Sequence, residues 1–186
     1  MGAADRWAQP RGEPPGDETG IRLSPVSYIV LGLLAFAGPA TPYDLKRLTN
    51  DTVSNLWSVN HSQLYKEPER LAGAGYLEES REPLGRRRKH YILTERGRSA
   101  LKAWLGVPSA EFTELRDPGL LQLFFGGEPE SLAKARLAVH EAKLEQYEQM
   151  YAEDPEAPPG WHLVLEAGIG HEREWIRFWS RIGGNG

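Results

Sequence analysis

The chain has 186 residues, contains no cysteine and carries a formal net charge of −4 at pH 7. The lack of cysteine excludes disulfide bonds and thiolate chemistry, and no apolar run approaches the length of a membrane span. The first residues lack the cationic start and apolar segment of a secretory signal, so we expect a cytoplasmic protein.

The charge is unevenly distributed along the chain. Residues 21–107 contain 13 Lys and Arg against 8 Asp and Glu, whereas residues 108–186 contain 7 against 14. Such asymmetry is typical of a protein in which one part contacts nucleic acid. We predict a disordered arm over residues 1–22, because it is rich in Gly, Pro and charge. A basic domain over residues 23–107 and a helical domain over residues 108–186 follow it.

Two helices are predicted at the start of the basic domain. Ser24 can cap the first and Pro25 can occupy its first position, and the helix should end at Gly38. Thr41 can cap the second, with Asp44 completing a capping box. We expect the first of these helices to be a core element without chemistry of its own.

A third helix is predicted between Trp57 and Gly75. Asn60 or Ser58 can cap it, Gly75 can end it in the left-handed conformation, and Trp57 is expected in the core. The stripe that should face the core consists of Leu64, Tyr65, Pro68, Leu71 and Ala72. The polar residues near the start of the helix, mostly off that stripe, are His61, Ser62, Gln63 and Lys66.

The polar start of this third helix is typical of a DNA-reading helix. In helix-turn-helix proteins, the N-terminal residues of the recognition helix meet base edges. Gln can pair with adenine through two hydrogen bonds, and Ser and Lys reach bases or phosphates. The alternative interpretation is a polar helix end that faces only solvent.

A β-hairpin with a cationic cluster is predicted directly after this helix. An extended run begins at Tyr76, a turn is expected over residues 83–85, and Tyr91 and Leu93 alternate with His90 and Ile92 in a second strand. Four consecutive cations follow the turn: Arg86, Arg87, Arg88 and Lys89. Because adjacent cations repel one another, they contribute little to folding, whereas a phosphate backbone would neutralise them. The pattern favours a DNA-binding wing over an ordinary solvated surface.

A fourth helix should run from its cap at Thr94 to about Leu105, with Leu101, Trp104 and Leu105 buried. Three helices, a hairpin and a closing helix predict a winged helix-turn-helix.

The second half is predicted to be helical. A short helix opens at Asp117 and Pro118, and longer ones run from Pro129 to about Glu153 and from Trp161 to Ile182. These helices are apolar on one side, so we expect antiparallel C-terminal helices that form the interface of a homodimer. The alternative is that they pack back onto the first domain of the same chain.

Aromatic and aliphatic residues in this half can line a cavity for a flat, apolar effector, or they can form the core of the interface. They are Leu137, Leu144, Tyr147, Tyr151, Trp161, Trp175 and Trp179.

No catalytic constellation is found in the sequence. His171 and Glu172 begin like a zinc-protease motif, but Trp175 occupies the position of the second histidine. A phosphate-binding loop and a nucleophile elbow are also lacking. We therefore expect no catalytic residues, no metal and no cofactor, and we predict that the protein is not an enzyme.

Several segments, in order, resemble the PadR family of bacterial transcriptional regulators. They are LSPVSYIVLGLL (23–34), YDL (43–45), HSQLY (61–65), RLAGAGYL (70–77), RRRKHYILTERG (86–97) and LRDPGLLQLFFG (115–126). The resemblance implies a homodimer through the C-terminal helices, a Tyr43 close to a DNA phosphate, and effectors such as phenolic acids or drug-like molecules. The family commonly has proline after the tyrosine of the third helix, whereas here Lys66 follows Tyr65 and the proline is Pro68.

The sequence thus predicts a mainly α protein with a small β-hairpin wing. We expect a sequence-specific transcriptional regulator, a repressor relieved by a small molecule, that binds double-stranded operator DNA of two-fold symmetry. The candidate DNA-binding residues are Tyr43, His61, Ser62, Gln63, Tyr65, Lys66, Arg86, Arg87, Arg88 and Lys89. The alternatives are a winged-helix module that binds only proteins, which would show no preference among DNA sequences, and an enzyme that uses the aromatic cavity.

Overall fold

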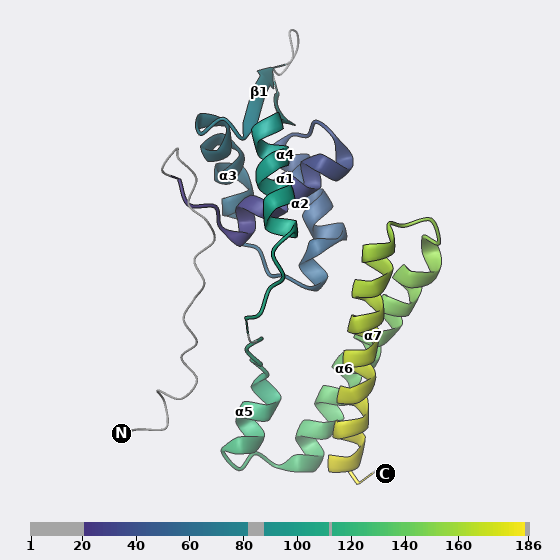
Figure 1. Cartoon of the computed structure of the whole chain (residues 1–186). Coiled ribbons are helices and arrows are strands. Elements are labelled where there is room, and N and C mark those ends of the chain that lie inside the picture. The colour runs from purple at the N-terminus through teal and green to yellow at the C-terminus, as the bar shows by residue number, and fades with distance from the viewer. Residues whose placement is uncertain (1–20, 82–87, 112, 185–186) are drawn as a thin grey trace. The chain divides into compact units, whose positions relative to one another are not determined.

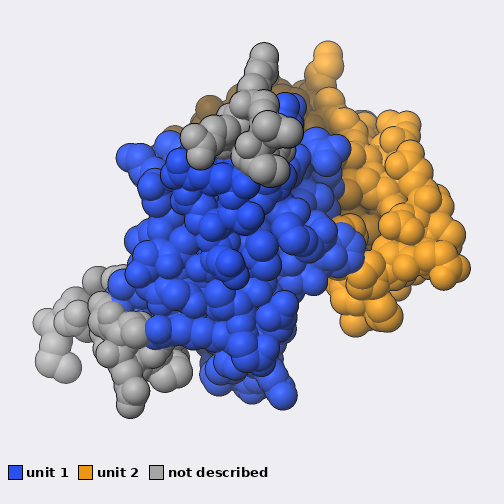
Figure 2. Space-filling model, turned by 90° about the horizontal axis from the view of Figure 1, so that it is seen from above, with its two compact units in different colours: residues 1–112 blue, residues 113–186 orange. Residues whose placement is uncertain are grey.

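The computed structural model describes residues 21–81, 88–111 and 113–184 (Figure 1). The chain divides into two compact units, residues 1–112 and residues 113–186 (Figure 2). The first unit contains α1 (Pro25–Ala37), α2 (Pro42–Asp51), the 3-10 turn η2 (Val53–Asn55), α3 (His61–Gly73), β1 (Leu77–Arg81), β2 (Lys89–Leu93) and α4 (Glu95–Leu105). The second contains α5 (Pro118–Phe124), α6 (Pro129–Glu153) and α7 (Pro159–Ile182). The prediction of a mainly helical chain with one hairpin after the third helix is confirmed.

The helix boundaries follow the capping residues. Ser24 and Thr41 each accept a hydrogen bond from the backbone of the third helical residue, and each forms a reciprocal capping box. Asn60 caps α3 by accepting a hydrogen bond from the Ser62 N–H. Gly75, with a φ of 79°, reverses the chain after α3 in the left-handed region that glycine favours.

The two strands form an antiparallel hairpin that is joined to the helices. Its register runs from Leu77 opposite Leu93 to Arg81 opposite Lys89. Tyr91 and Leu93 are buried, as the alternation predicted, and Tyr91 also forms an isolated bridge to Ala40 in the connection between α1 and α2. The predicted turn and the cations Arg86 and Arg87 lie outside the described residues.

The core of the first unit is built from the apolar faces of α1, α2 and α3 and the inner face of the hairpin. Its most deeply buried side chains come from every one of these elements: Val30, Leu31, Leu45, Leu64, Leu71 and Tyr91. Because these residues occupy one side of each element, the opposite side of α3 is left to solvent.

In the second unit, α6 and α7 pack against one another along their length (Figure 1). Tyr147 of α6 lies against Gly168 of α7 so closely that a Cβ on Gly168 would be 2.9 Å from the Tyr147 ring. Trp179 of α7 is fully buried. The buried His140 Nδ1 lies 2.6 Å from the Glu172 carboxylate across the same helix pair. Asp117 caps α5 and also pairs with Arg136 of α6.

The prediction that four aromatic and apolar residues are buried is wrong. Trp57 and Tyr65 are both 46% exposed, and Trp104 and Leu105 are 46% and 68% exposed. Successive helical residues are about 100° apart, so Leu64 fills the core and turns its neighbour Tyr65 away. Trp57 lies in the connection after η2, beyond the helices that fill the core. Trp104 stacks against the ring of Tyr28 instead of being enclosed, with 4.6 Å between ring centroids.

Candidate nucleic-acid interface

The first two turns of α3 present polar side chains to solvent. His61, Ser62, Gln63 and Lys66 are exposed, whereas Leu64 between them is fully buried. The helical period produces this separation, because the residues that anchor α3 to the core recur on one side only. The structure therefore brings together the polar residues that the sequence singled out, on an exposed helix start that can enter a groove.

The four exposed residues differ in their local partners. The Ser62 hydroxyl donates to Asn60 Oδ1 at 2.9 Å, and His61 Nε2 lies 3.2 Å from Asn50 Oδ1 of α2. In the described part of the chain, the side chains of Gln63 and Lys66 have no hydrogen-bond or ion-pair partner. Gln63 and Lys66 are thus available to an external ligand without breaking an internal contact.

Two candidate tyrosines are also exposed. Tyr43 lies in the first turn of α2 and is 66% exposed, and Tyr65 lies in α3. Asp44, beside Tyr43, is held ionised: hydrogen bonds from the Thr41 side chain and backbone lower the pKa of its carboxyl group. The Tyr43 hydroxyl can donate to a phosphate oxygen, because nothing in the described residues encloses it.

The wing cations differ from one another. Arg88 is exposed, immediately before β2. Lys89, the first residue of β2, lies 3.0 Å from a Glu79 carboxylate oxygen and 3.4 Å from one of Glu69. Its hydrogen bond with Glu79 raises the pKa of Lys89, and the same hydrogen bond is the main cause of a lowered pKa at Glu79. Lys89 thus connects β2 to β1 and to α3 through partly exposed ion pairs, which usually contribute little to stability, and the expectation that these cations contribute little to folding stays a prediction.

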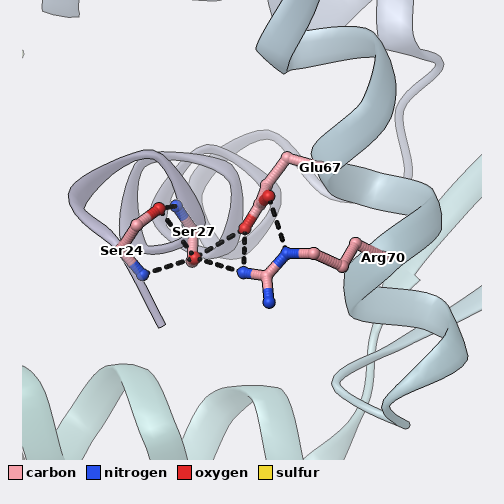
Figure 3. Close-up of polar contacts among 4 residues, drawn as sticks. All are labelled: Ser24, Ser27, Glu67 and Arg70. Atoms are coloured by element: carbon pink, nitrogen blue, oxygen red, sulfur yellow. Dashed lines mark hydrogen bonds and ion pairs between the residues drawn. The ribbon is translucent and has the colours of Figure 1, made fainter. Parts of the chain in front are cut away.

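Sequence reasoning missed a polar cluster beneath α3. The Ser27 hydroxyl of α1 donates to Glu67 Oε1 at 2.6 Å, and Arg70 Nη2 donates to Ser27 Oγ at 3.1 Å (Figure 3). Arg70 also binds the Glu67 carboxylate through Nε and Nη2, at 2.9 and 2.6 Å. The spacing of three residues between Glu67 and Arg70 signals an ion pair on one helix. Ser27 precedes the buried Val30, Leu31 and Leu34 by three, four and seven residues, so the helical period could have indicated that it is buried.

The pKa of Glu67 is the balance of opposing effects. Burial acts to raise it, but hydrogen bonds from Arg70 and Ser27 together with the Arg70 charge outweigh burial, so the pKa is lowered. The Glu67 hydrogen bond is the main cause of a raised pKa at Arg70. Both groups are therefore charged near neutral pH.

The proposed effector residues of the second unit do not all face the same space. Tyr147 and Trp179 are buried between α6 and α7 of one chain, and Leu137, Leu144 and Trp175 are half-buried. Tyr151 and Trp161 are 38% and 36% exposed. An open surface cavity of about 420 Å³ includes Tyr151, between Glu148 and Glu166.

A search of the described residues finds no group of three or more His, Asp or Glu side chains that could hold a metal ion. Within the same residues, no helix combines the length and the hydrophobicity needed to cross a membrane.

Two family profiles match consecutive parts of the chain. Residues 30–103 match the Transcriptional regulator PadR-like family, and residues 115–182 match the family described as Virulence activator alpha C-term. Together they span most of the chain and divide it close to the boundary between the two compact units.

Individual relatives agree with these matches. The negative transcriptional regulator PadR of Bacillus subtilis (strain 168) is 27% identical over 173 residues, which cover 84% of this chain and 94% of that protein. The crystal structure of Bacillus subtilis PadR in complex with operator DNA is similar with a TM-score of 0.75 and 25% identity, over 86% of this chain and 97% of the other. The crystal structure of the same protein in complex with p-coumaric acid gives a TM-score of 0.71 at 25% identity, over 86% and 96%.

Proposed function

Because the chain belongs to the PadR-like family and is thus a DNA-binding transcriptional regulator, we propose that it represses transcription by reading a specific operator as a homodimer. Binding of a small molecule to the dimer releases the operator. In this proposal, residues 23–107 carry DNA binding and residues 108–186 carry assembly and effector binding. The protein acts in the cytoplasm, where the chromosome is accessible.

The exposed polar start of α3 is the observation that carries this proposal. Gln63 reads a base through its amide, Ser62 and His61 contact bases or the adjacent backbone, and Lys66 adds a charge within reach of the groove. Tyr65 lies on the same exposed helix and packs against a sugar or a thymine methyl group. Among the residues that the structure describes, Gln63 and Lys66 have no side-chain partner, which supports this assignment, since no such contact has to be broken when they bind.

The wing and α2 supply contacts that do not depend on sequence. Arg88 binds a phosphate, and Arg86 and Arg87, which lie outside the described residues, do the same or enter the adjacent minor groove. Lys89 keeps its ion pairs with Glu79 and Glu69, and its positive charge attracts the DNA backbone without a direct phosphate contact. Tyr43 donates to a phosphate at the start of α2. These contacts set the position of α3 on the duplex.

Dimer formation uses the helices of the second unit. Large apolar side chains there remain exposed on the single chain: Leu115, Leu121, Phe124, Phe125, Val139, Leu163 and Val164. Exposed apolar surface of this extent is typical of a protein interface. Two copies related by a two-fold axis present two reading helices, which suits an operator with two half-sites.

The effector is proposed to be a small aromatic acid or a related flat molecule. The support is the Bacillus subtilis PadR crystal structure with p-coumaric acid, at 25% identity. Tyr151 and Trp161, both partly exposed near the connection between α6 and α7, are aromatic residues that can stack on such a ring. Trp175 lies 14 residues beyond Trp161 on α7, about 21 Å along the helix, so Trp175, Leu137 and Leu144 would serve a second position along the helix pair or the interface. Tyr147 and Trp179 are buried in the core of the helix pair, where they hold α6 and α7 together.

The experiment is fluorescence-anisotropy binding of the full chain to the DNA directly upstream of its own gene, beside a scrambled DNA, at two salt concentrations. Tight binding to the upstream DNA that weakens with salt and is relieved by p-coumaric acid or a related phenolic acid supports both operator reading and the effector. Equally weak binding to both DNAs contradicts sequence-specific reading, and tight binding that no phenolic acid weakens contradicts the effector.

A further inference from the structure

We propose that Ser27, Glu67 and Arg70 form a positioning device that sets the orientation of the reading helix α3 on α1, and that this device determines how well the protein discriminates its operator from other DNA. The inference rests on the proposed function of α3. It assigns a role to three residues that do not touch DNA in this account.

The hydrogen bonds of Ser27 join the start of α1 to α3 at one atom. Ser27 Oγ donates to Glu67 of α3, and it accepts from Arg70 Nη2 of α3 and from the backbone N–H of Ser24, at 2.8 Å (Figure 3). A hydroxyl has one hydrogen to donate and two lone pairs to accept with, so the capacity of Ser27 is filled. The side chain is fully buried, and therefore water cannot replace a lost partner.

The hydrogen bonds of the cluster fix the orientation of the Glu67 carboxylate. The side chain of Glu67 is 13% exposed and that of Arg70 is 37% exposed, and the hydroxyl, the carboxylate and the guanidinium each bond the other two. The guanidinium holds both carboxylate oxygens through Nε and Nη2, which fixes the plane of the carboxylate. A rotation or a slide of α3 along α1 would break the bond to Ser27, because the directions of all three groups are fixed.

The packing of α3 against the core also has an apolar part, which is less directional. Leu64, Pro68 and Leu71 of α3 pack into the core beside Val30 and Leu34 of α1. Apolar side chains tolerate small shifts, whereas a fully satisfied polar network specifies one arrangement. The apolar core sets which side of α3 faces inward, and the network adds directional contacts that restrict small rotations about that orientation.

The device lies on the stripe of α3 that begins at the reading residue. Gln63, Glu67 and Arg70 are spaced by four and three residues, so they follow one another along one side of the helix. A change in the rotation of α3 at Glu67 moves Gln63, one turn away, by a comparable angle. Hydrogen bonds to base edges are directional, and contacts to phosphate are much less so. Loss of the device should therefore reduce discrimination more than it reduces overall affinity.

The test compares Ser27→Ala with Thr49→Val. Both remove a buried hydroxyl from the first unit, but the Thr49 hydroxyl donates to Leu45 O within α2 and has no partner on another described element. Affinity is measured by fluorescence anisotropy for operator and scrambled DNA, beside circular dichroism and thermal unfolding. Ser27→Ala should lower the ratio of the two affinities by about tenfold, as expected when one base contact is degraded. Thr49→Val should leave that ratio unchanged at a similar loss of thermal stability.

A second variant keeps the proposal testable if Ser27→Ala does not fold. Arg70→Lys retains the positive charge on a partly exposed position but loses the fork that binds Glu67 and Ser27 together. It should lower the affinity ratio in the same way, with the slope of log affinity against log salt unchanged, since no phosphate contact is lost.

The outcomes separate this inference from the proposed function. If the wild type itself does not discriminate between the DNAs, the proposed function fails. If the wild type discriminates, and Ser27→Ala and Arg70→Lys fold and keep its full ratio, the cluster is structural only and the positioning role is overturned. A steeper loss of affinity for scrambled DNA than for operator would also overturn it.

Discussion

The proposed DNA contacts are of two kinds, base contacts and phosphate contacts, and substitutions of single residues can measure each kind separately. Gln63 offers an amide that can pair with one particular base, whereas Arg88 offers a charge that any phosphate accepts. The two residues lie on different elements, the first turns of α3 and the start of β2. Substitutions should therefore separate sequence discrimination from general affinity.

Arg88→Ala should weaken binding to operator and scrambled DNA by a similar factor, because it removes one phosphate contact. The slope of log affinity against log salt should flatten by about one unit. Salt titrations by fluorescence anisotropy measure both effects. Arg98→Ala is the control, since Arg98 is an exposed cation on α4 that pairs with Glu95. A loss confined to the operator would show that Arg88 reads bases.

Gly97 in α4 is a residue whose small size the fold requires. A Cβ at this position would overlap the carbonyl oxygen of Tyr76 and would lie 2.7 Å from Leu93 Cδ1. Gly97→Ala should therefore destabilise the first unit by about 1–3 kcal/mol, the usual cost of overpacking. Urea unfolding measures the change.

The control for Gly97→Ala is Gly32→Ala in α1, where an added Cβ meets nothing within 4 Å. Because alanine favours the helix more than glycine does, Gly32→Ala should stabilise by about 0.5–1 kcal/mol. Equal effects of the two substitutions would contradict the close packing between α4 and the start of the hairpin.

At the scale of elements, the pair formed by α1 and α3 depends on an ionised carboxylate. The pKa of Glu67 is lower in the fold than its ordinary value of 4.5, so the fold favours the ionised form. The stabilisation is therefore complete above that value and is lost as the pH falls through the lowered pKa.

Glu67→Gln should cost about 1–2 kcal/mol in the free energy of unfolding near neutral pH, because hydrogen bonds to a charged group are lost. The difference from the wild type should shrink as the pH falls below about 4. Urea unfolding from about pH 7 to about pH 3 measures it. A difference that stays constant over this range would mean that the charge of Glu67 does not stabilise the fold.

The ends of the helices were predictable from the sequence where residues close by in the chain determine them. Ser24, Thr41 and Thr94 cap their helices as the sequence indicated, and Gly75 ends α3 in the left-handed conformation. These features depend on neighbours within a few residues of the chain.

Features that depend on distant packing were not predictable in the same way. Trp104 was expected to be buried, but it lies on the surface against Tyr28, which is 76 positions earlier in the chain. The hydroxyl of Ser27 meets a carboxylate 40 positions away. The polar start of α3 was predictable because the helical period alone separates Gln63 from Leu64.

At the scale of the whole molecule, the proposed homodimer explains the exposed apolar residues of the second unit. Phe124 and Phe125 of α5 are 82% and 77% exposed. Such residues are costly to leave in water and are typical of interfaces.

Phe124→Glu should weaken or abolish the dimer, because it introduces a charge into a proposed apolar interface. Analytical ultracentrifugation should then report the 20.8 kDa mass of one chain in place of twice that mass. Gln122→Glu is the control, since it adds the same charge to an exposed position of the same helix. A wild type that sediments as one chain would contradict the dimer, and a Phe124→Glu variant that stays dimeric would exclude Phe124 from the interface.

The most direct test of the central claim is the affinity of Gln63→Ala for operator and scrambled DNA, beside the wild type and Gln122→Ala. If the start of α3 reads bases, Gln63→Ala should lose about 1–3 kcal/mol of binding free energy on the operator and almost none on scrambled DNA. Gln122→Ala should bind both DNAs as the wild type does. A Gln63→Ala variant that retains the full preference of the wild type for the operator would contradict the assignment of α3 as the reading helix.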